Sequence, residues 1–412
     1  MALASKNFAL GLRILGSKPK ILFGNSSQTI FKVSVASITG RASRTEPLVK
    51  PKPWPYRERG YNNIHACFDG TKKRLGENSK VVVVEGPPAI GKSELARALA
   101  EELDMQYFPM PTSETYYING YGFDLRTINH ELPEHYHTFD EKDFLKNPKS
   151  EKTVRLEMIL WYQKFLQYAD SLCHLLNTGE GVVLDRCVYS HSVFSDTLFE
   201  MGYLTKLEKD TLQKLKDAVM GELMKPHLII YLDAPVSVVE ANLKKRGLGE
   251  EKVWNRQMLE KIEHKYKHEF LKSITVHAEL LAYDWSSPGE AEVVVEDIER
   301  IDFDRFDIHD PKMEDWRIKE DYDWSEKRWI YTHKIDKIQD GITCVPVYRV
   351  PALCMLPEDT DLVSSIMEKY PGHKYQEGFN YDQGDRSFIF STRLPRRVWK
   401  DYSLEGAKLA TA

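Results

Sequence analysis

Short apolar runs alternate with helical patterns through the middle of the chain. Val81–Val84 is an all-valine run typical of a buried parallel strand, and in residues 93–103 Ala and Leu recur three and four positions apart, which predicts a helix. Four further strands are expected, within 105–109, at 181–185, at 227–233 and within 277–283. The alternation predicts an α/β fold in which a five-stranded parallel sheet is flanked by helices.

Helical patterns fill the spaces between the expected strands. Thr153–Thr178 is the longest, with Leu and Ile forming an apolar side and Gly179 ending it. A second helix is expected over 288–299, and a short one over 62–76 before the first strand. Prolines at 47, 51, 53 and 55 favour an extended segment ahead of that short helix.

A complete phosphate-binding loop, G-x-x-x-x-G-K-[ST], connects the valine run to the first helix at 86–93. Gly86 and Gly91 let the backbone turn back so that its N–H groups converge beside the positive end of the helix. Gly86, Ile90 and Gly91 are therefore expected to bind a nucleotide. The alternative is a glycine-rich turn that only caps the helix.

The last two residues of the loop argue against mere capping. Lys92 would neutralise β- and γ-phosphate oxygens, and the Ser93 hydroxyl would ligate magnesium. We expect a bound nucleotide, which is ATP, ADP or a deoxynucleotide, together with magnesium. We expect neither a flavin nor an iron–sulfur cluster.

Composition excludes some classes of partner. A net charge of -5 over 412 residues gives no basic footprint for nucleic acid. No run approaches the roughly 18 apolar residues of a membrane-spanning helix, so no transmembrane helix is expected. The five cysteines are scattered and odd in number, which favours a reducing compartment over a disulfide or zinc framework.

The first 45 residues have the composition of a mitochondrial presequence. They contain no Asp or Glu, while Lys and Arg recur among many Ser and Thr. We expect cleavage near residues 35–45 and a mature protein in the mitochondrial matrix. A disordered basic arm is the alternative.

Residues at the expected strand ends resemble the deoxyribonucleoside kinases. Asp185-Arg186-Cys187 resembles their D/E-R-S motif, with Cys187 in place of Ser. The resemblance implies that Asp185, like Ser93, holds the metal and that Arg186 contacts phosphate. The alternative is a solvated ion pair at the end of a strand.

Two further stretches extend this resemblance. Phe165–Tyr168 resembles the helix that presents a Gln to the nucleobase, so Gln167 is the implied base reader, although a half-buried Gln needs no ligand. Lys244–Arg246 lies where these kinases carry a lid that closes over phosphates, which implies nucleotide contacts for Lys245 and Arg246. Gly247–Gly249 departs from that arginine-rich pattern, and a solvated helix face is the alternative.

The catalytic base of these kinases has no counterpart at its usual place. They carry a Glu just after the second strand, whereas the corresponding residue here is Met110, and a thioether cannot accept a proton. Loss of a general base typically lowers the rate by ~10²- to 10⁴-fold. Glu114 is near enough in sequence to substitute. The pattern favours a domain that holds a nucleotide without efficient turnover.

The C-terminal region resembles a narrower group, the kinase-like accessory subunits of mitochondrial respiratory complex I. Part of the resemblance lies in the kinase-like region. The rest lies in a C-terminal extension that deoxyribonucleoside kinases lack, at Val345–Tyr348, Gly372–Tyr375, Gly378–Asn380 and Gly384-Asp385. It implies a noncatalytic subunit that supports assembly or stability. Its partners would be other complex I subunits of the membrane arm, on the matrix side of the inner membrane. An active mitochondrial deoxyribonucleoside kinase, with Glu114 or Asp185 as its base, is the alternative.

These patterns divide the chain into four parts: a presequence and its flank (1–45), an extended segment (46–78), a P-loop kinase-like domain (79–300) and a long C-terminal extension (301–412). The extension is expected to be irregular and to lay Trp316, Trp324, Trp329 and Trp399 across partner surfaces. The alternative is that these rings cover the chain's own core. His264 and His268 have metal-ligand spacing but are expected on a surface helix.

Overall fold

The computed structural model describes residues 14–15, 37–44, 52–247, 253–307, 309–333, 340–386, 389 and 392. Most of the predicted presequence, and Trp399 in the extension, therefore lie outside the described residues. In the described part no helix is long and apolar enough to cross a membrane.

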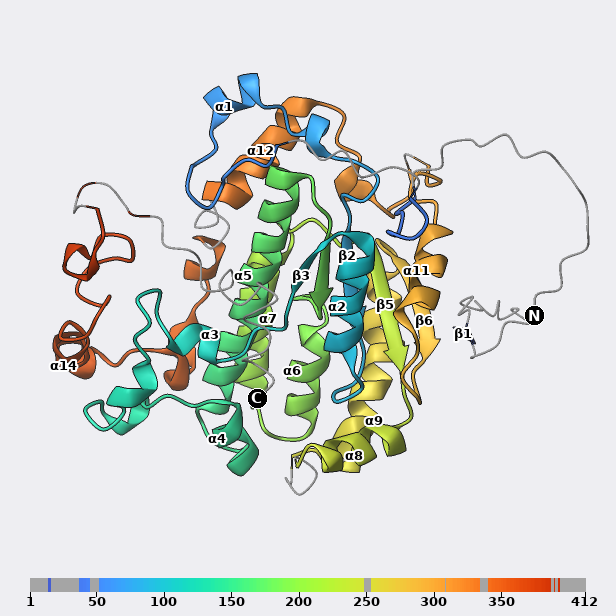
Figure 1. Cartoon of the computed structure of the whole chain (residues 1–412). Helices are drawn as coiled ribbons and strands as arrows, with labels where there is room; N and C mark the ends of the chain where they lie inside the picture. The colour runs from blue at the N-terminus through green and yellow to red at the C-terminus, as the bar shows by residue number, and fades with distance from the viewer. Residues whose placement is uncertain are drawn as a thin grey trace, which may run out of the picture.

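One parallel sheet organises the molecule, and the predicted five-stranded core is confirmed (Figure 1). Its strands, in spatial order, are β6 (Glu279–Asp284), β5 (Leu228–Asp233), β2 (Val81–Glu85), β4 (Val182–Asp185) and β3 (Gln106–Phe108). A two-residue strand that the sequence pattern did not predict, β1 (Ile14–Leu15), pairs with β6 and falls within the expected presequence.

Alternating side chains of the strands build two cores, one on each face of the sheet. Val81 and Val83 of β2 pack with α5 on one face, while Val82 and Val84 pack with α2 on the other. All four valines are fully buried, as the apolar run predicted. The helices of this domain are α2 (Lys92–Leu103), α5 (Thr153–Thr178), α6 (His191–Glu200), α7 (Lys206–Met220), α8 (Val236–Lys245), α9 (Arg256–Lys265), η4 (Tyr266–Phe270), α10 (Leu271–Ile274) and α11 (Ala291–Glu299).

The long connection between β3 and α5 packs against α14 (Pro357–Met367) of the C-terminal extension. It contains α3 (Glu114–Tyr117), η2 (Leu125–Ile128), η3 (Glu134–Tyr136) and α4 (Glu141–Lys146). Ile128 and Leu132 of this connection form a small apolar cluster with Val363 and Ile366 of α14. The late part of the extension is thus attached to the kinase-like domain.

The extension contains more regular structure than the sequence pattern indicated. Besides α14 it has η5 (Glu314–Trp316), α12 (Asp321–His333), η6 (Val347–Arg349), η7 (Pro351–Leu353) and η8 (Tyr381–Gln383). Trp316 packs against the core of the kinase-like domain and donates from Nε1 to the carbonyl of Lys225 at 2.8 Å, and Trp324 is buried in that core. These two rings therefore cover the chain's own core, as the alternative interpretation held.

Segments before and after the kinase-like domain meet at one end of the sheet. The expected helix over 62–76 is two short pieces, α1 (Asn63–Phe68) and η1 (Lys72–Arg74). Figure 1 shows α1 beside α12, at the end of the sheet opposite α8 and α9. Because the P-loop follows the carboxyl end of β2, this meeting point lies far from the phosphate-binding loop.

Candidate functional site

The predicted phosphate-binding loop forms a tight turn between β2 and α2. Gly86, Ala89 and Gly91 have φ values of +148°, +59° and +84°. A Cβ on Gly86 would lie 2.5 Å from the carbonyl oxygen of Leu232 and 3.0 Å from Cδ1 of the buried Ile90. Only glycine fits at position 86, and Ile90 anchors the loop in the core.

Lys92, the first residue of α2, is buried at the mouth of this loop. Its ammonium donates a hydrogen bond to the carbonyl oxygen of Pro87. Burial, and then the nearby Arg186, lower the pKa of Lys92 to about 7, although Asp185 and Glu85 act in the opposite direction. An anion beside the ammonium would restore the charged form, so the loop is electrostatically prepared for phosphate.

Ser93 and Asp185 come together as the sequence predicted. Asp185 ends β4 in register with Val84 of β2, and the Ser93 hydroxyl donates to Asp185 Oδ2. No group among the described residues hydrogen-bonds to the buried Asp185 Oδ1. A hydroxyl and a carboxylate with an open oxygen fit the ligand preference of Mg²⁺, which usually takes one or two protein oxygens together with phosphates and water.

Arg186 is fixed in a strained conformation beside the loop. Its φ is +66°, and its Nη1 donates to the hydroxyl of Tyr266 at 2.8 Å, which in turn donates to Glu85 Oε2 at 3.1 Å. Asp185 and Arg186 are only 4% and 5% exposed, so the alternative of a solvated ion pair is wrong. Glu85 also accepts the Cys187 N–H at 2.9 Å, which holds this turn against β2.

Gln167 is buried on α5 and is close to the end of β3. Its Nε2 donates to the carbonyl oxygen of Pro109, next to Met110. The amide thus has a partner within the chain, and its assignment as base reader stays a prediction.

The sequence pattern missed a buried polar cluster along α5. Glu157 Oε1 lies 2.8 Å from His191 Nε2, and His191 Nδ1 lies 3.2 Å from the Lys164 ammonium. The Lys164 ammonium and the Arg186 guanidinium both contact the ring of Phe194, at 5.5 and 4.5 Å from its centroid. The cluster therefore adjoins the residues that are predicted to bind phosphate. The sequence did contain a sign of this cluster, because the charged residues at 157 and 164 share one face of a helix that is otherwise apolar on that side.

Burial shifts the titration of this cluster. It lowers the pKa of His191 to about 4 despite the neighbouring Glu157, and it lowers the pKa of Lys164 to about 8, with Arg186 as the second cause. His191 is consequently neutral at physiological pH.

The predicted catalytic position carries Met110, whose side chain is 42% exposed. Glu114, the nearby carboxylate, points to Arg126, with its Oε1 3.3 Å from Arg126 Nη2. Arg126 is also held by Asp124 at 2.8 Å. Glu114 is thus engaged in an exposed ion-pair network.

The lid region is only partly described. Lys245 ends α8 and Arg246 follows it; both side chains are exposed. Arg246 is close enough to contribute to the lowered pKa of Lys92. Leu248 and Gly249 lie outside the described residues.

His264 and His268 lie on an exposed helical surface, with ring centroids 4.5 Å apart. Among the residues that the structure describes, no group of three or more His, Cys, Asp or Glu side chains is arranged to hold a metal ion. The described part of the chain gives this pair no third ligand.

Comparison with known proteins shows the family to which the chain belongs. Residues 82–316 match the deoxynucleoside kinase family, which is more than half of the chain, and the chain therefore belongs to that family. It is also 32% identical over 316 residues to the mitochondrial NADH dehydrogenase [ubiquinone] 1 alpha subcomplex subunit 10 of Bos taurus, which covers 76% of this chain and 88% of that protein.

The chain also matches proteins that are named as deoxynucleoside kinases. Identity to the deoxyguanosine kinase of Dictyostelium discoideum is 21% over 233 residues, covering 57% of this chain and 73% of that enzyme. The solved structure of deoxyadenosine kinase from M. mycoides with bound dCTP is 16% identical, with a TM-score of 0.41, and covers 54% of this chain and 100% of that one.

Proposed function

We propose that this chain is a noncatalytic accessory subunit of mitochondrial respiratory NADH dehydrogenase, complex I, and that it supports assembly or stability of the complex. The 32% identity to alpha subcomplex subunit 10 supports this assignment. The acid-free composition of residues 1–45 supports a mitochondrial location, and the protein would lie on the matrix side of the inner membrane against subunits of the membrane arm.

The observation that carries the noncatalytic assignment is the contrast between two parts of the site. The phosphate cradle is complete, with the glycines, Lys92, Ser93 and Asp185 in place. Just after β3, where the family resemblance implies a general base, stands the thioether of Met110. Binding therefore needs only residues that are present, whereas proton abstraction lacks its usual group.

The chain's own residues account for nucleotide binding. Backbone N–H groups around Gly86 and Gly91 and the Lys92 ammonium would hold the phosphates. Arg186, kept in place by Tyr266, would meet a second phosphate oxygen. A magnesium ion on Ser93 and Asp185 would neutralise phosphate charge and fix the distance between the two sides of the cradle.

Such a nucleotide would act as a structural ligand. A ligand that binds only the folded state stabilises it by about 2.7 kcal/mol at one hundred times its dissociation constant. Binding would add a further connection between the loop after β2, the start of α2 and the turn after β4, which the Ser93–Asp185 and Cys187–Glu85 hydrogen bonds already link. The retained cradle thus has a use without turnover.

An active deoxyribonucleoside kinase is the second candidate. The family match favours this candidate, because it is a family of kinases. The buried Arg186 favours it as well, because a phosphoryl-transfer enzyme also needs a cation beside the phosphates. In that case Glu114 would have to break its ion pair with Arg126 to act as the base. Alternatively, Asp185 would have to take the proton of the nucleoside hydroxyl, although the hydrogen bond from Ser93 lowers the proton affinity of its carboxylate.

Native-gel fractionation of mitochondria tests the proposed function. We expect the chain to run with the large NADH dehydrogenase band, and its depletion to lower the amount of that band. A chain that runs entirely apart from the band would contradict the assignment.

A further inference from the structure

A small apolar surface protrudes from the end of the molecule opposite the P-loop. Ile64 and Phe68 of α1 are 70% and 88% exposed, and Tyr322 of the neighbouring α12 is 67% exposed; we call these three residues the α1 surface. Ile64 and Phe68 are four positions apart and so share one face of α1. Large apolar side chains exposed together on one helix face are a feature of interaction sites.

The α1 helix has only six residues, and contacts with its cap and with neighbouring side chains hold it in place. Asn62 caps the helix by accepting hydrogen bonds from the Ile64 and His65 N–H groups at 3.1 Å. The His65 ring packs on Trp54, with centroids 4.8 Å apart. An isolated helix of this length would not be stable in water, so the surrounding contacts determine where Phe68 points.

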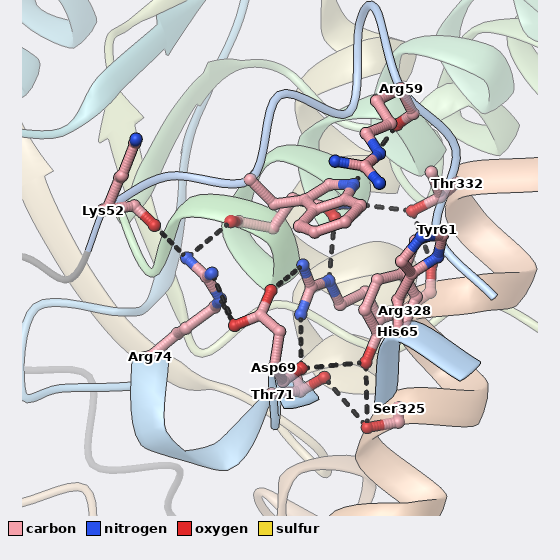
Figure 2. Close-up of polar contacts among 12 residues, drawn as sticks. Lys52, Arg59, Tyr61, His65, Asp69, Thr71, Arg74, Ser325, Arg328 and Thr332 are labelled. Carbon is pink, nitrogen blue, oxygen red and sulfur yellow. Dashed lines mark hydrogen bonds and ion pairs between the residues drawn. The ribbon is translucent and has the colours of Figure 1, made fainter. Parts of the chain in front are cut away.

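A buried network fastens the C-terminal end of α1 to α5 and α12 (Figure 2). The fully buried Arg328 donates to Asp69 Oδ2 at 2.9 Å and to Asn177 Oδ1 at 2.8 Å, and it lies 3.7 Å from the centroid of the Tyr61 ring. Arg74 donates to Asp69 Oδ1 at 2.6 Å. Two buried cations around one carboxylate are stable only in a well-defined hydrogen-bonded arrangement, because burying charge is costly. The network therefore holds α1 in place and orients its exposed face before a partner binds.

Charged side chains of both signs lie near α1. The Lys72 N–H donates to Asp321 Oδ1 at 2.7 Å, and the Arg59 guanidinium lies over the Trp54 ring that packs on His65. Arg59, Lys72 and Lys73 are exposed on the side of the N-terminal segment. Glu320 and Asp323 are exposed beside Tyr322. An apolar centre with a charged rim has the anatomy of a protein interface.

We propose that the α1 surface docks a protein partner, which offers an apolar pocket for Phe68 and acidic side chains to the basic side of the rim. The rim favours a protein over an anionic membrane, because Glu320 and Asp323 would face the same negative surface as the cations. A protein can meet both signs with complementary charges. This inference rests on the proposed function, in which the partner is a neighbouring subunit of the respiratory complex.

Replacement of Phe68 by Asp tests the docking surface in mitochondria that lack the native chain. We expect Phe68→Asp to keep the wild-type melting temperature and nucleotide content, and to lower incorporation into the large complex at least tenfold. Val293→Asp, at an exposed apolar residue of α11, is the matched control and should incorporate normally. Normal incorporation of Phe68→Asp would overturn the docking proposal and leave the proposed function intact.

Photo-crosslinking identifies what covers the surface. Cys67 is exposed on α1, whereas Cys344 is exposed and Cys354 half-buried in the extension, so Cys344→Ser with Cys354→Ser directs a maleimide photo-crosslinker toward the α1 surface and Cys67→Ser provides the control. We expect a crosslink from Cys67 to one other protein, absent in Phe68→Asp. A crosslink only within the chain, no crosslinked protein, or Phe68-dependent flotation with anionic phospholipid vesicles would overturn the proposal. The crosslink can be measured even if the chain runs apart from complex I. That result would contradict the proposed function and leave the docking proposal to be decided by the crosslink.

Discussion

The guanidinium of Arg328 donates to the carboxylate of Asp69 across 259 positions of sequence, with 2.9 Å between Nη2 and Oδ2. The contact joins a segment that precedes the P-loop domain to a helix that follows it. The start of the C-terminal extension is therefore part of the same folded unit as the sheet, and it does not hang free as an arm.

Loss of this buried cation should destabilise the whole domain. Arg328→Met leaves Asp69 with Arg74 alone and removes the contact to Asn177, so we expect unfolding in urea to lose about 3–5 kcal/mol. The matched control is Arg305→Met, whose exposed pair with Glu279 should be worth less than about 1 kcal/mol. Equal losses in the two variants would contradict the structural role of Arg328.

The turn of the P-loop should not tolerate a methyl group. In Gly86→Ala the new Cβ would meet the carbonyl oxygen of Leu232 at 2.5 Å, at a φ of +148°. We expect lost nucleotide binding and a destabilisation of about 1–3 kcal/mol. Gly76→Ala, where nothing lies within 4 Å of the new atom, should bind nucleotide normally. Calorimetry of both variants with magnesium-ATP provides the comparison.

Nucleotide binding should depend on pH through Lys92. Its pKa of about 7 in the free protein rises when phosphate is bound, so the bound form takes up a proton above pH 7. We expect affinity to fall between pH 7 and pH 9, by at most tenfold per pH unit. In Lys92→Arg the cation stays protonated, and this dependence should largely disappear. Equal pH profiles for the two proteins, measured by titration calorimetry, would argue against a titrating Lys92.

Acid should weaken the fold through His191. Burial lowers its folded pKa to about 4, below the ordinary value near 6.5, so the unfolded chain binds the proton more readily. Stability from this group is therefore present above pH 6.5 and is lost as pH falls toward 4. We expect His191→Gln to reduce the loss by on the order of 2 kcal/mol in urea unfolding at pH 4.5 against pH 7. An unchanged loss would assign acid sensitivity to other groups.

Local patterns were enough to predict the sheet and the tight turn between β2 and α2; phosphate binding by that turn stays a prediction. The run Val81–Val84 is buried on both faces, and Lys92 and Ser93 follow a turn whose chemistry is contained in eight consecutive residues. The kinase resemblance implied a shared metal role for Ser93 and Asp185, and the pairing of β2 with β4 brings the two side chains together.

Features that depend on distant segments escaped prediction. Nothing local to Glu157 indicates that His191 will lie 2.8 Å away, and the polarity of α12 hides the burial of Arg328 between Asp69 and Tyr61. In both cases a charged residue is buried because a partner arrives from elsewhere in the chain. The local pattern gives no sign of such burial, because a charged residue in a polar stretch is more often at the surface.

The most direct test of the central claim is a turnover measurement on purified protein with magnesium-ATP and a panel of deoxynucleosides, alongside mass spectrometry of the bound nucleotide. The account predicts a nucleotide that is retained by the wild type and lost in Lys92→Ala, with no phosphoryl transfer above background. Clear turnover that Asp185→Ala abolishes would contradict it and would make the chain an active kinase.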